Sequence, residues 1–179
     1  MTQRVVLLQA LASTPRDVER LVGALPPEGH EWQPDGDWSV QQVLAHLVEA
    51  EAILRSRLER TRREDNPALP PFDPHDHAAL PPAPAADGLV EAFAATRQVT
   101  LAFLTDLNPG EWQRPATRDS LGGTTLRWQV VDMMNHDLAH LGQLVDIRVK
   151  WDDAKHGAYN AMRTLRVAPS STQHVTRDS

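Results

Sequence analysis

Two histidines spaced four residues apart carry the strongest chemical signal in the sequence. His136 and His140 lie within the segment Asn135–Gln143, and residues four apart on an α-helix project from one face about 6 Å from each other. Apolar residues surround the pair, and a neutral imidazole that faces a core needs a partner for its ring nitrogens. A shared cation would meet that need for both. The apolar neighbours are Val130, Met133, Met134, Leu141, Leu144 and Val145.

A third ligand is needed for a stable site of the catalytic type, and His46 is the candidate. It lies between Val43, Leu47 and Ala50 on the apolar side of an expected helix. Taken alone, an inward histidine of this kind is more often a structural core residue than a ligand. Three nitrogen ligands leave a fourth position open, which is the arrangement of a catalytic zinc site. Zinc is therefore the expected ion, and nickel, manganese and iron are the alternatives.

Other polar residues near the pair are candidates for orienting ligands or substrate. Gln143 follows His140 by three residues and Asp132 precedes His136 by four, so both lie on nearly the same helix face. For neighbouring Asp137, as for Glu49, a place on the exposed surface is at least as good an interpretation.

The remaining histidines are weaker candidates. His75 and His77 lie in a proline-rich segment, where they could bind a metal adventitiously or cover the site as a lid. His30, His156 and His174 have no partner at useful spacing and are expected to be solvated.

Apolar periodicity and capping residues predict four helices that would position these side chains. The clearest start is Ser39, because Gln42 three residues later completes a capping box. In the first helix, Thr14–Pro15 marks either a restart or a kink. The expected helices cover about 7–22, 40–63, 88–107 and 124–150, and a short fifth helix could span 152–165.

The connection between the second and third helices is long and rich in proline. Half of the 14 prolines fall within 66–87, so this segment cannot remain helical. It is long enough to reach the opposite end of a bundle. The sequence therefore predicts an all-α four-helix bundle with a crossover loop between helices 2 and 3. Residues 1–167 would form one domain, and 168–179 a polar, disordered tail.

Composition excludes several classes of function. The 179 residues include no cysteine, which rules out thiolate metal sites, disulfides and a cysteine nucleophile. A net charge of −6 argues against nucleic acid as a partner. The arginine-rich run 55–63 is interleaved with glutamate and is interpreted as a solvated helix end. No segment approaches the ~20 apolar residues of a membrane span.

The segment Trp38–Leu47, followed by the pattern His136-Asp-x-x-His140-x-x-Gln143, resembles the DinB/YfiT-like family of metal-binding four-helix bundles. The resemblance spans roughly 15–148. In that family the corresponding positions form a three-histidine metal site, which maps onto His46, His136 and His140. The resemblance also implies a homodimer in the cytoplasm.

The expected function is that of a divalent-metal-dependent enzyme acting on a small molecule. Members that resemble this chain transfer low-molecular-weight thiols, such as bacillithiol or mycothiol, to an electrophile, and this is the first expectation. Metal-assisted hydrolysis is the second, although the sequence assigns no general base for it. A metal-binding stress-response module without turnover is the third, because a fold does not settle a function.

Overall fold

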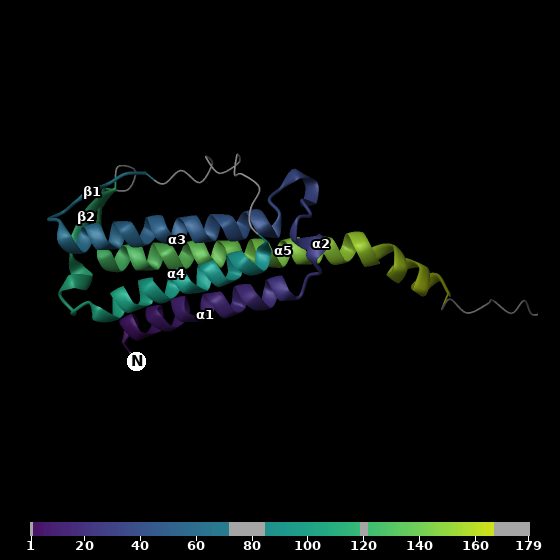
Figure 1. Ribbon diagram of the computed structural model, residues 1–179, viewed down its shortest axis with the longest axis horizontal. Helices are drawn as coiled ribbons and strands as arrows, with labels where there is room; N and C mark the ends of the chain where they lie inside the picture. Colours follow the sequence, from purple (N-terminus) through teal and green to yellow (C-terminus); the bar gives the residue numbers. More distant parts are fainter. Residues whose placement is uncertain (1, 72–84, 119–121, 167–179) are drawn as a thin grey trace, which may run out of the picture.

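The computed structural model describes residues 2–71, 85–118 and 122–166 and consists mainly of four long helices (Figure 1). The expected bundle is confirmed. One difference is that the fourth and fifth expected helices form a single helix. The four helices are α1 (Gln3–Gly23), α3 (Val40–Arg63), α4 (Ala86–Asp106) and α5 (Leu126–Arg166).

Local capping signals mark the starts of α3 and α5 close to where the sequence predicts them. The Ser39 side chain accepts a hydrogen bond from the Gln42 backbone N–H, and the Gln42 side chain accepts one from the Ser39 N–H. Thr125 acts in the same way before α5, where its hydroxyl accepts from the Trp128 N–H. Pro15 neither ends nor restarts α1, which continues to Gly23.

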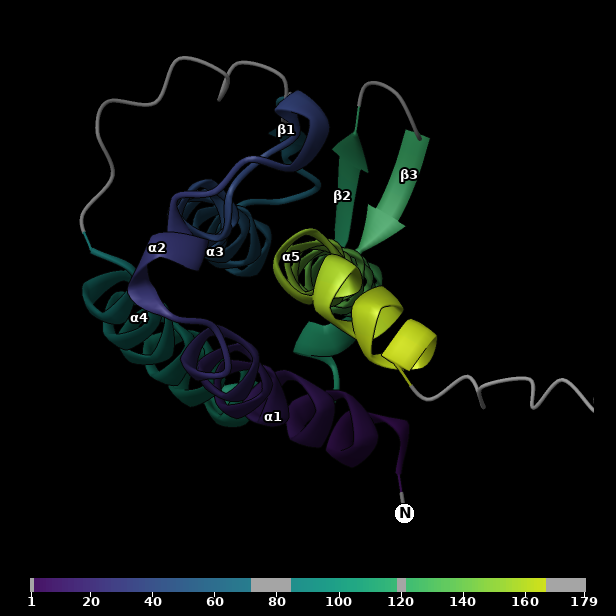
Figure 2. The same cartoon turned by 90° about the vertical axis from the view of Figure 1, so that its right-hand side faces the viewer.

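The order of the helices around the bundle differs from a simple up-and-down arrangement. α1 and α5 run in one direction, and α3 and α4 run in the other (Figure 1). α3 packs against α4 and α5, and α1 packs against the same two helices (Figure 2). α1 therefore lies diagonally opposite α3, and α4 lies diagonally opposite α5. Because α3 and α4 are parallel, the connection between Arg63 and Ala86 joins opposite ends of the bundle, as predicted.

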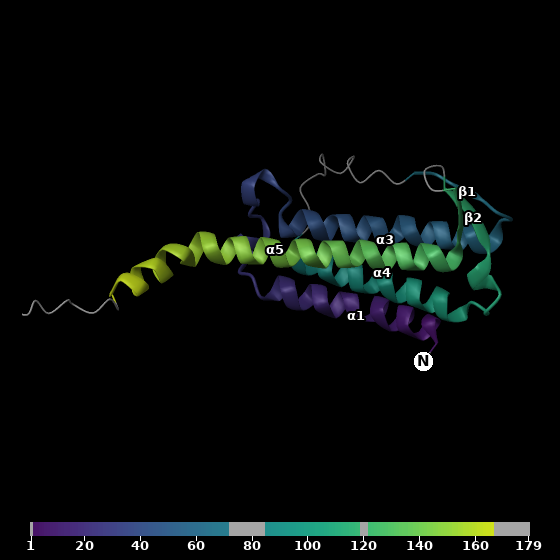
Figure 3. The same cartoon turned by 180° about the vertical axis from the view of Figure 1, so that it is seen from behind.

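A small sheet at one end of the bundle was not predicted. It comprises β1 (Ala68–Leu69), β2 (Pro115–Arg118) and β3 (Gly122–Thr125), with β1 parallel to β2 and β2 antiparallel to β3. Leu69 pairs with Arg118, which ties the segment after α3 to the segment before α5. The short helix α2 (Pro27–His30) lies at the other end, and α5 runs from the sheet past it (Figure 3).

A buried polar layer divides the core into two apolar clusters. One cluster, near α2, includes Val18, Val43, Phe93 and Leu144. The other, near the sheet, includes Leu7, Leu54, Leu104 and Met133. Between the two clusters lies a layer of buried polar side chains with members from all four long helices: Thr14, Glu51, Arg97 and Asp137.

No helix in the described residues is long and apolar enough to cross a membrane. The expected tail at 168–179 lies outside the described residues.

Candidate metal centre

The three predicted histidines meet in the structure. His46 comes from α3, and His136 and His140 come from α5, one turn apart. The Nε2 atoms of His46 and His136 are 3.0 Å apart, and the ligand nitrogens of all three lie within 4.8 Å of one another. Because a divalent ion binds imidazole nitrogen at about 2.0–2.1 Å, small side-chain rotations would let one ion reach all three.

Trp38 covers this cluster from the start of α3. Its ring lies edge-on to His46, with centroids 5.1 Å apart, and parallel to His140, with centroids 6.3 Å apart and planes inclined by 4°. Trp38 directly precedes the capping residue Ser39, so the chain entry into α3 holds the indole over the imidazoles. His46 is fully buried as a result.

Burial keeps the histidines of α5 uncharged near neutral pH. It lowers the pKa of His136 from 6.5 to about 4, helped by the nearby charges of His140 and Arg97. Burial also lowers the pKa of His140, although a hydrogen bond to Gln143 and the charge of Asp137 oppose this. A neutral imidazole is the form that binds a metal ion, so the site needs little proton release before binding.

The structure places both residues predicted to surround the ligands. Gln143 Oε1 lies 2.9 Å from His140 Nδ1. Since that oxygen is an acceptor, it fixes the proton on Nδ1 and leaves Nε2 as the nitrogen that could bind a metal ion. Asp132 lies one turn before His136 and lines the same pocket, where its Oδ2 accepts a hydrogen bond of 2.7 Å from Arg118 Nη1.

A pocket of about 480 Å³ opens onto the three histidines. This volume is typical of sites for small molecules. Besides the histidines, the pocket is lined by Leu54, Arg57, Arg118, Asp132 and Asn135.

Two of the lining residues were missed by sequence reasoning. The interpretation of the run 55–63 as a solvated helix end is wrong for Arg57, which is buried. It lies about three turns after His46, so helical spacing could have placed it on the same face. Arg118 comes from β2, and no local signal in the sequence pointed to this strand.

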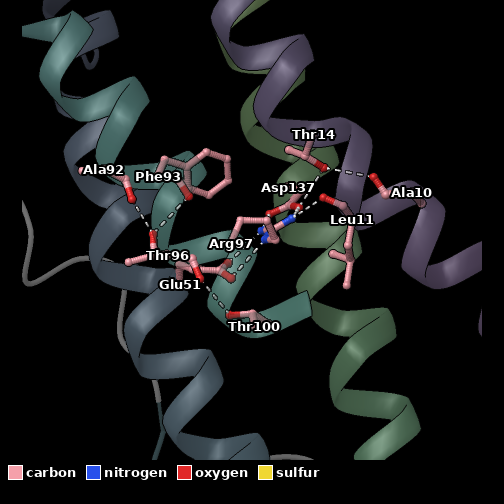
Figure 4. A network of polar contacts seen from close by, with 10 residues as sticks. All are labelled: Ala10, Leu11, Thr14, Glu51, Ala92, Phe93, Thr96, Arg97, Thr100 and Asp137. Carbon is pink, nitrogen blue, oxygen red and sulfur yellow. Dashed lines mark hydrogen bonds and ion pairs between the residues drawn. The ribbon is translucent and has the colours of Figure 1, made fainter. Parts of the chain in front are cut away.

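The polar layer includes Asp137, the residue next to His136 in α5. Asp137 is buried and forms an ion pair with Arg97, so of the two interpretations left open for it, the exposed surface is wrong. Glu49 is exposed. Arg97 also donates to both carboxylate oxygens of Glu51, at 3.0 and 2.7 Å (Figure 4). Burial disfavours the charge of Arg97, but the hydrogen bonds to Asp137 and Glu51 outweigh it and raise the pKa of Arg97. The layer thus fixes α5 at the position of the metal-site histidines.

The other histidines do not join the cluster where they are described. A ring nitrogen of His30 is 3.1 Å from the Val22 carbonyl oxygen, and His156 is exposed. His75, His77 and His174 lie outside the described residues. In the part of the chain whose side chains are described, His46, His136 and His140 form the one group of three that could hold a metal ion.

The fold and the histidine cluster together define a class of protein, a four-helix bundle with a candidate three-histidine metal centre. More particularly, the chain belongs to the DinB superfamily, whose sequence model matches residues 10–144. This range contains all three histidines and Gln143, and it confirms the resemblance found in the sequence.

A solved structure with the same fold is that of YfiT from Bacillus subtilis. It is described as a probable metal-dependent hydrolase with an unusual four-helix bundle topology. The two chains are 18% identical, the match covers 88% of this chain and 90% of that one, and the TM-score is 0.75. At this identity the likeness establishes the fold. Among curated proteins, none matches this chain.

Proposed function

We propose that this protein is a divalent-metal-dependent enzyme acting on a small molecule in the pocket beside the histidines. The observation that carries the proposal is the convergence of His46, His136 and His140 at a pocket of about 480 Å³. A purely structural site usually has four protein ligands, whereas three leave room for a reactant.

The donor set fits a metal ion on the chemistry of its atoms. All three ligands are imidazoles, which suit zinc and also nickel and iron; zinc is our first choice. Gln143 orients His140, and burial keeps His136 and His140 neutral. When bound, the ion would act as a Lewis acid and lower the pKa of a water or thiol.

Water is the nucleophile that the site supports best. Asp132 adds a carboxylate to the same pocket, which is the general base that hydrolysis needs and that the sequence alone had not assigned. The description of YfiT as a probable metal-dependent hydrolase agrees with this choice. Hydrolysis therefore moves ahead of thiol transfer, the first expectation from the sequence.

Thiol transfer remains the second candidate. The chain has no cysteine, so a low-molecular-weight thiol such as bacillithiol or mycothiol would have to enter from outside. A pocket of about 480 Å³ has room for such a thiol beside the histidines. In this reaction the thiol would replace water, and Asp132 would not be needed to activate it.

Metal content tests the proposal first. We would purify untagged protein without chelator and measure bound metals by mass spectrometry. The wild type should hold about one equivalent, and His46→Ala and His136→Ala should each hold little. His156→Ala is the matched control, because His156 is exposed on the same helix as His136. Equal metal content in all four proteins, with the fold intact, would overturn the ligand assignment.

Product analysis then separates the two nucleophiles. Metal-loaded protein would be incubated with activated esters and alkylating electrophiles, with and without bacillithiol or mycothiol, and products identified by mass. Hydrolysis should proceed without thiol and fall strongly in Asp132→Asn. Thiol transfer would give a thiol adduct and survive that substitution. No turnover of either kind by a metal-loaded protein would favour a binding module.

A further inference from the structure

Two arginines and one carboxylate stand together in the pocket. Arg57, Arg118 and Asp132 line the pocket that contains the histidines, and all three also line a second cavity of about 10 Å³. Among the described residues that line this pocket, these are the charged side chains, so cations outnumber anions there in a chain whose overall net charge is −6.

The sheet brings the two arginines together. Arg118 lies on β2 opposite Leu69 of β1, and Arg57 Nη2 donates a hydrogen bond of 2.7 Å to the carbonyl oxygen of Pro70, the next residue after β1. The adjacent residues Leu69 and Pro70 therefore hold Arg118 from β2 and Arg57 from α3, respectively. Such a support fixes two long side chains that would otherwise lose much rotamer freedom on binding a ligand.

The neighbouring positive charges of Arg57 and Arg118 repel each other, so an anion beside both would be favourable. Burial and the neighbouring charge of Arg118 lower the pKa of Arg57, and the opposing effect of Asp132 is smaller. Arg118 uses Nη1 to bond Asp132, while its buried Nε has no hydrogen-bond partner in the described part of the chain. A buried donor without a partner is unfavourable, and an incoming oxygen would relieve it.

We propose that Arg57 and Arg118 form the binding site for a carboxylate group of the substrate, placed beside the three histidines. Guanidinium groups bind carboxylates through paired, charge-assisted hydrogen bonds. Asp132, which lines the same pocket, repels a dianionic phosphate more strongly than a monoanionic carboxylate. The inference rests on the proposed function in taking this pocket as the substrate site, and it adds the chemical class of the substrate.

Binding of simple probes tests the inference without turnover. We would titrate metal-loaded and metal-free protein at low salt with succinamate, which has one carboxylate, and with succinamide, its neutral analogue. Inorganic phosphate would be the third probe. Succinamate should bind at least about tenfold more tightly than succinamide and more tightly than phosphate. Equal affinity for the neutral analogue, or a preference for phosphate, would overturn the assignment of a carboxylate.

Substitutions in opposite directions sharpen the test. Arg118→Gln and Arg57→Gln should each weaken succinamate binding about tenfold. Asp132→Asn should tighten it, because it removes the competing carboxylate. Arg63→Gln is the matched control, since Arg63 is exposed on the same helix as Arg57. Should Arg57→Gln fail to fold, Arg118→Gln and Asp132→Asn decide the matter, and unchanged binding in both would overturn the inference.

Metal content keeps this inference separate from the proposed function. All the arginine variants should retain the metal content of the wild type. Metal-loaded protein that does not bind succinamate would contradict the carboxylate site and leave the proposed function unaffected. Metal-free protein that never takes up metal, yet binds succinamate through Arg118, would contradict the proposed function and leave the anion site standing.

Discussion

Arg97 donates a hydrogen bond of 3.0 Å to the carbonyl oxygen of Leu11, and this contact replaces a backbone hydrogen bond that α1 lacks. Within a helix that carbonyl would accept from the N–H four residues later, but position 15 is proline and has no N–H. The guanidinium of α4 takes the place of the missing donor. This accounts for an uninterrupted α1 through Pro15, and it joins the helix to the polar layer that supports His136.

Substitution of Arg97 should be the most destabilising change in the core. Arg97→Met would leave Glu51 and Asp137 buried without their cation and would remove the donor to Leu11. Breaking a buried ion pair in this way costs roughly 3–5 kcal/mol. The free energy of unfolding, measured by urea denaturation, checks the expectation.

A second variant makes the same substitution at an exposed arginine and serves as the matched control. Arg127→Met changes an exposed arginine that bonds Gln3 at the surface and should cost less than about 0.5 kcal/mol. If the two variants unfold at similar urea concentrations, the polar layer does not hold the four helices together.

Gln143 should tune metal affinity without being a ligand. In Gln143→Leu the His140 Nδ1 loses its acceptor at 2.9 Å, so the ring loses both its orientation and part of its basicity. Loss of such a partner typically lowers metal affinity 10–100-fold. Competition with a chelator of known affinity would measure the change. Gln113→Leu, at an exposed position, should match the wild type, and an equal effect in both would argue against a specific role.

Acid should destabilise the metal-free protein through His136. Its pKa is about 4 in the folded state, against 6.5 for an ordinary histidine. Between these two pH values the unfolded chain therefore binds a proton at this residue, whereas the folded chain does not. The stability from the neutral ring is complete above pH 6.5 and falls as the pH drops toward 4. Urea denaturation in EDTA at several pH values should show this loss.

The variant His136→Gln isolates that effect from the carboxylates, which titrate in the same range. Its side chain takes up no proton, so its free energy of unfolding should fall less steeply between pH 6.5 and 4. Parallel curves for the two proteins would show that the buried histidine does not control this part of the pH dependence.

Local signals in the sequence were enough for the helices and for much of the metal centre. Ser39 and Gln42 are three residues apart, and a capping box depends on nothing beyond them. His136 and His140 share a helix face by spacing alone, while pairing them with His46 drew on the family resemblance as well. The histidine cluster was therefore predictable from helical spacing combined with that resemblance.

Residues whose role depends on distant partners were not predictable in the same way. The strand β1 has two residues, and its identity comes from pairing Leu69 with Arg118 rather than from a pattern of its own. For Asp137 the sequence left a surface position open, because a charged residue is seldom buried without a partner. Its partner Arg97 lies forty positions earlier on another helix, so only the assembled bundle brings the two together.

The capping box of α3 should link helix stability to the metal centre. Ser39 is 4% exposed, and Ser39→Ala would leave the Gln42 N–H without its acceptor. Loss of a serine cap typically costs ~1 kcal/mol, and the entry that holds Trp38 over His46 would loosen. We therefore expect a lower free energy of unfolding together with weaker metal binding. Ser13→Ala is the control, because Ser13 is exposed within α1 and bonds only its own helix. A stability loss without any change in metal affinity would show that Trp38 keeps its place independently of the cap.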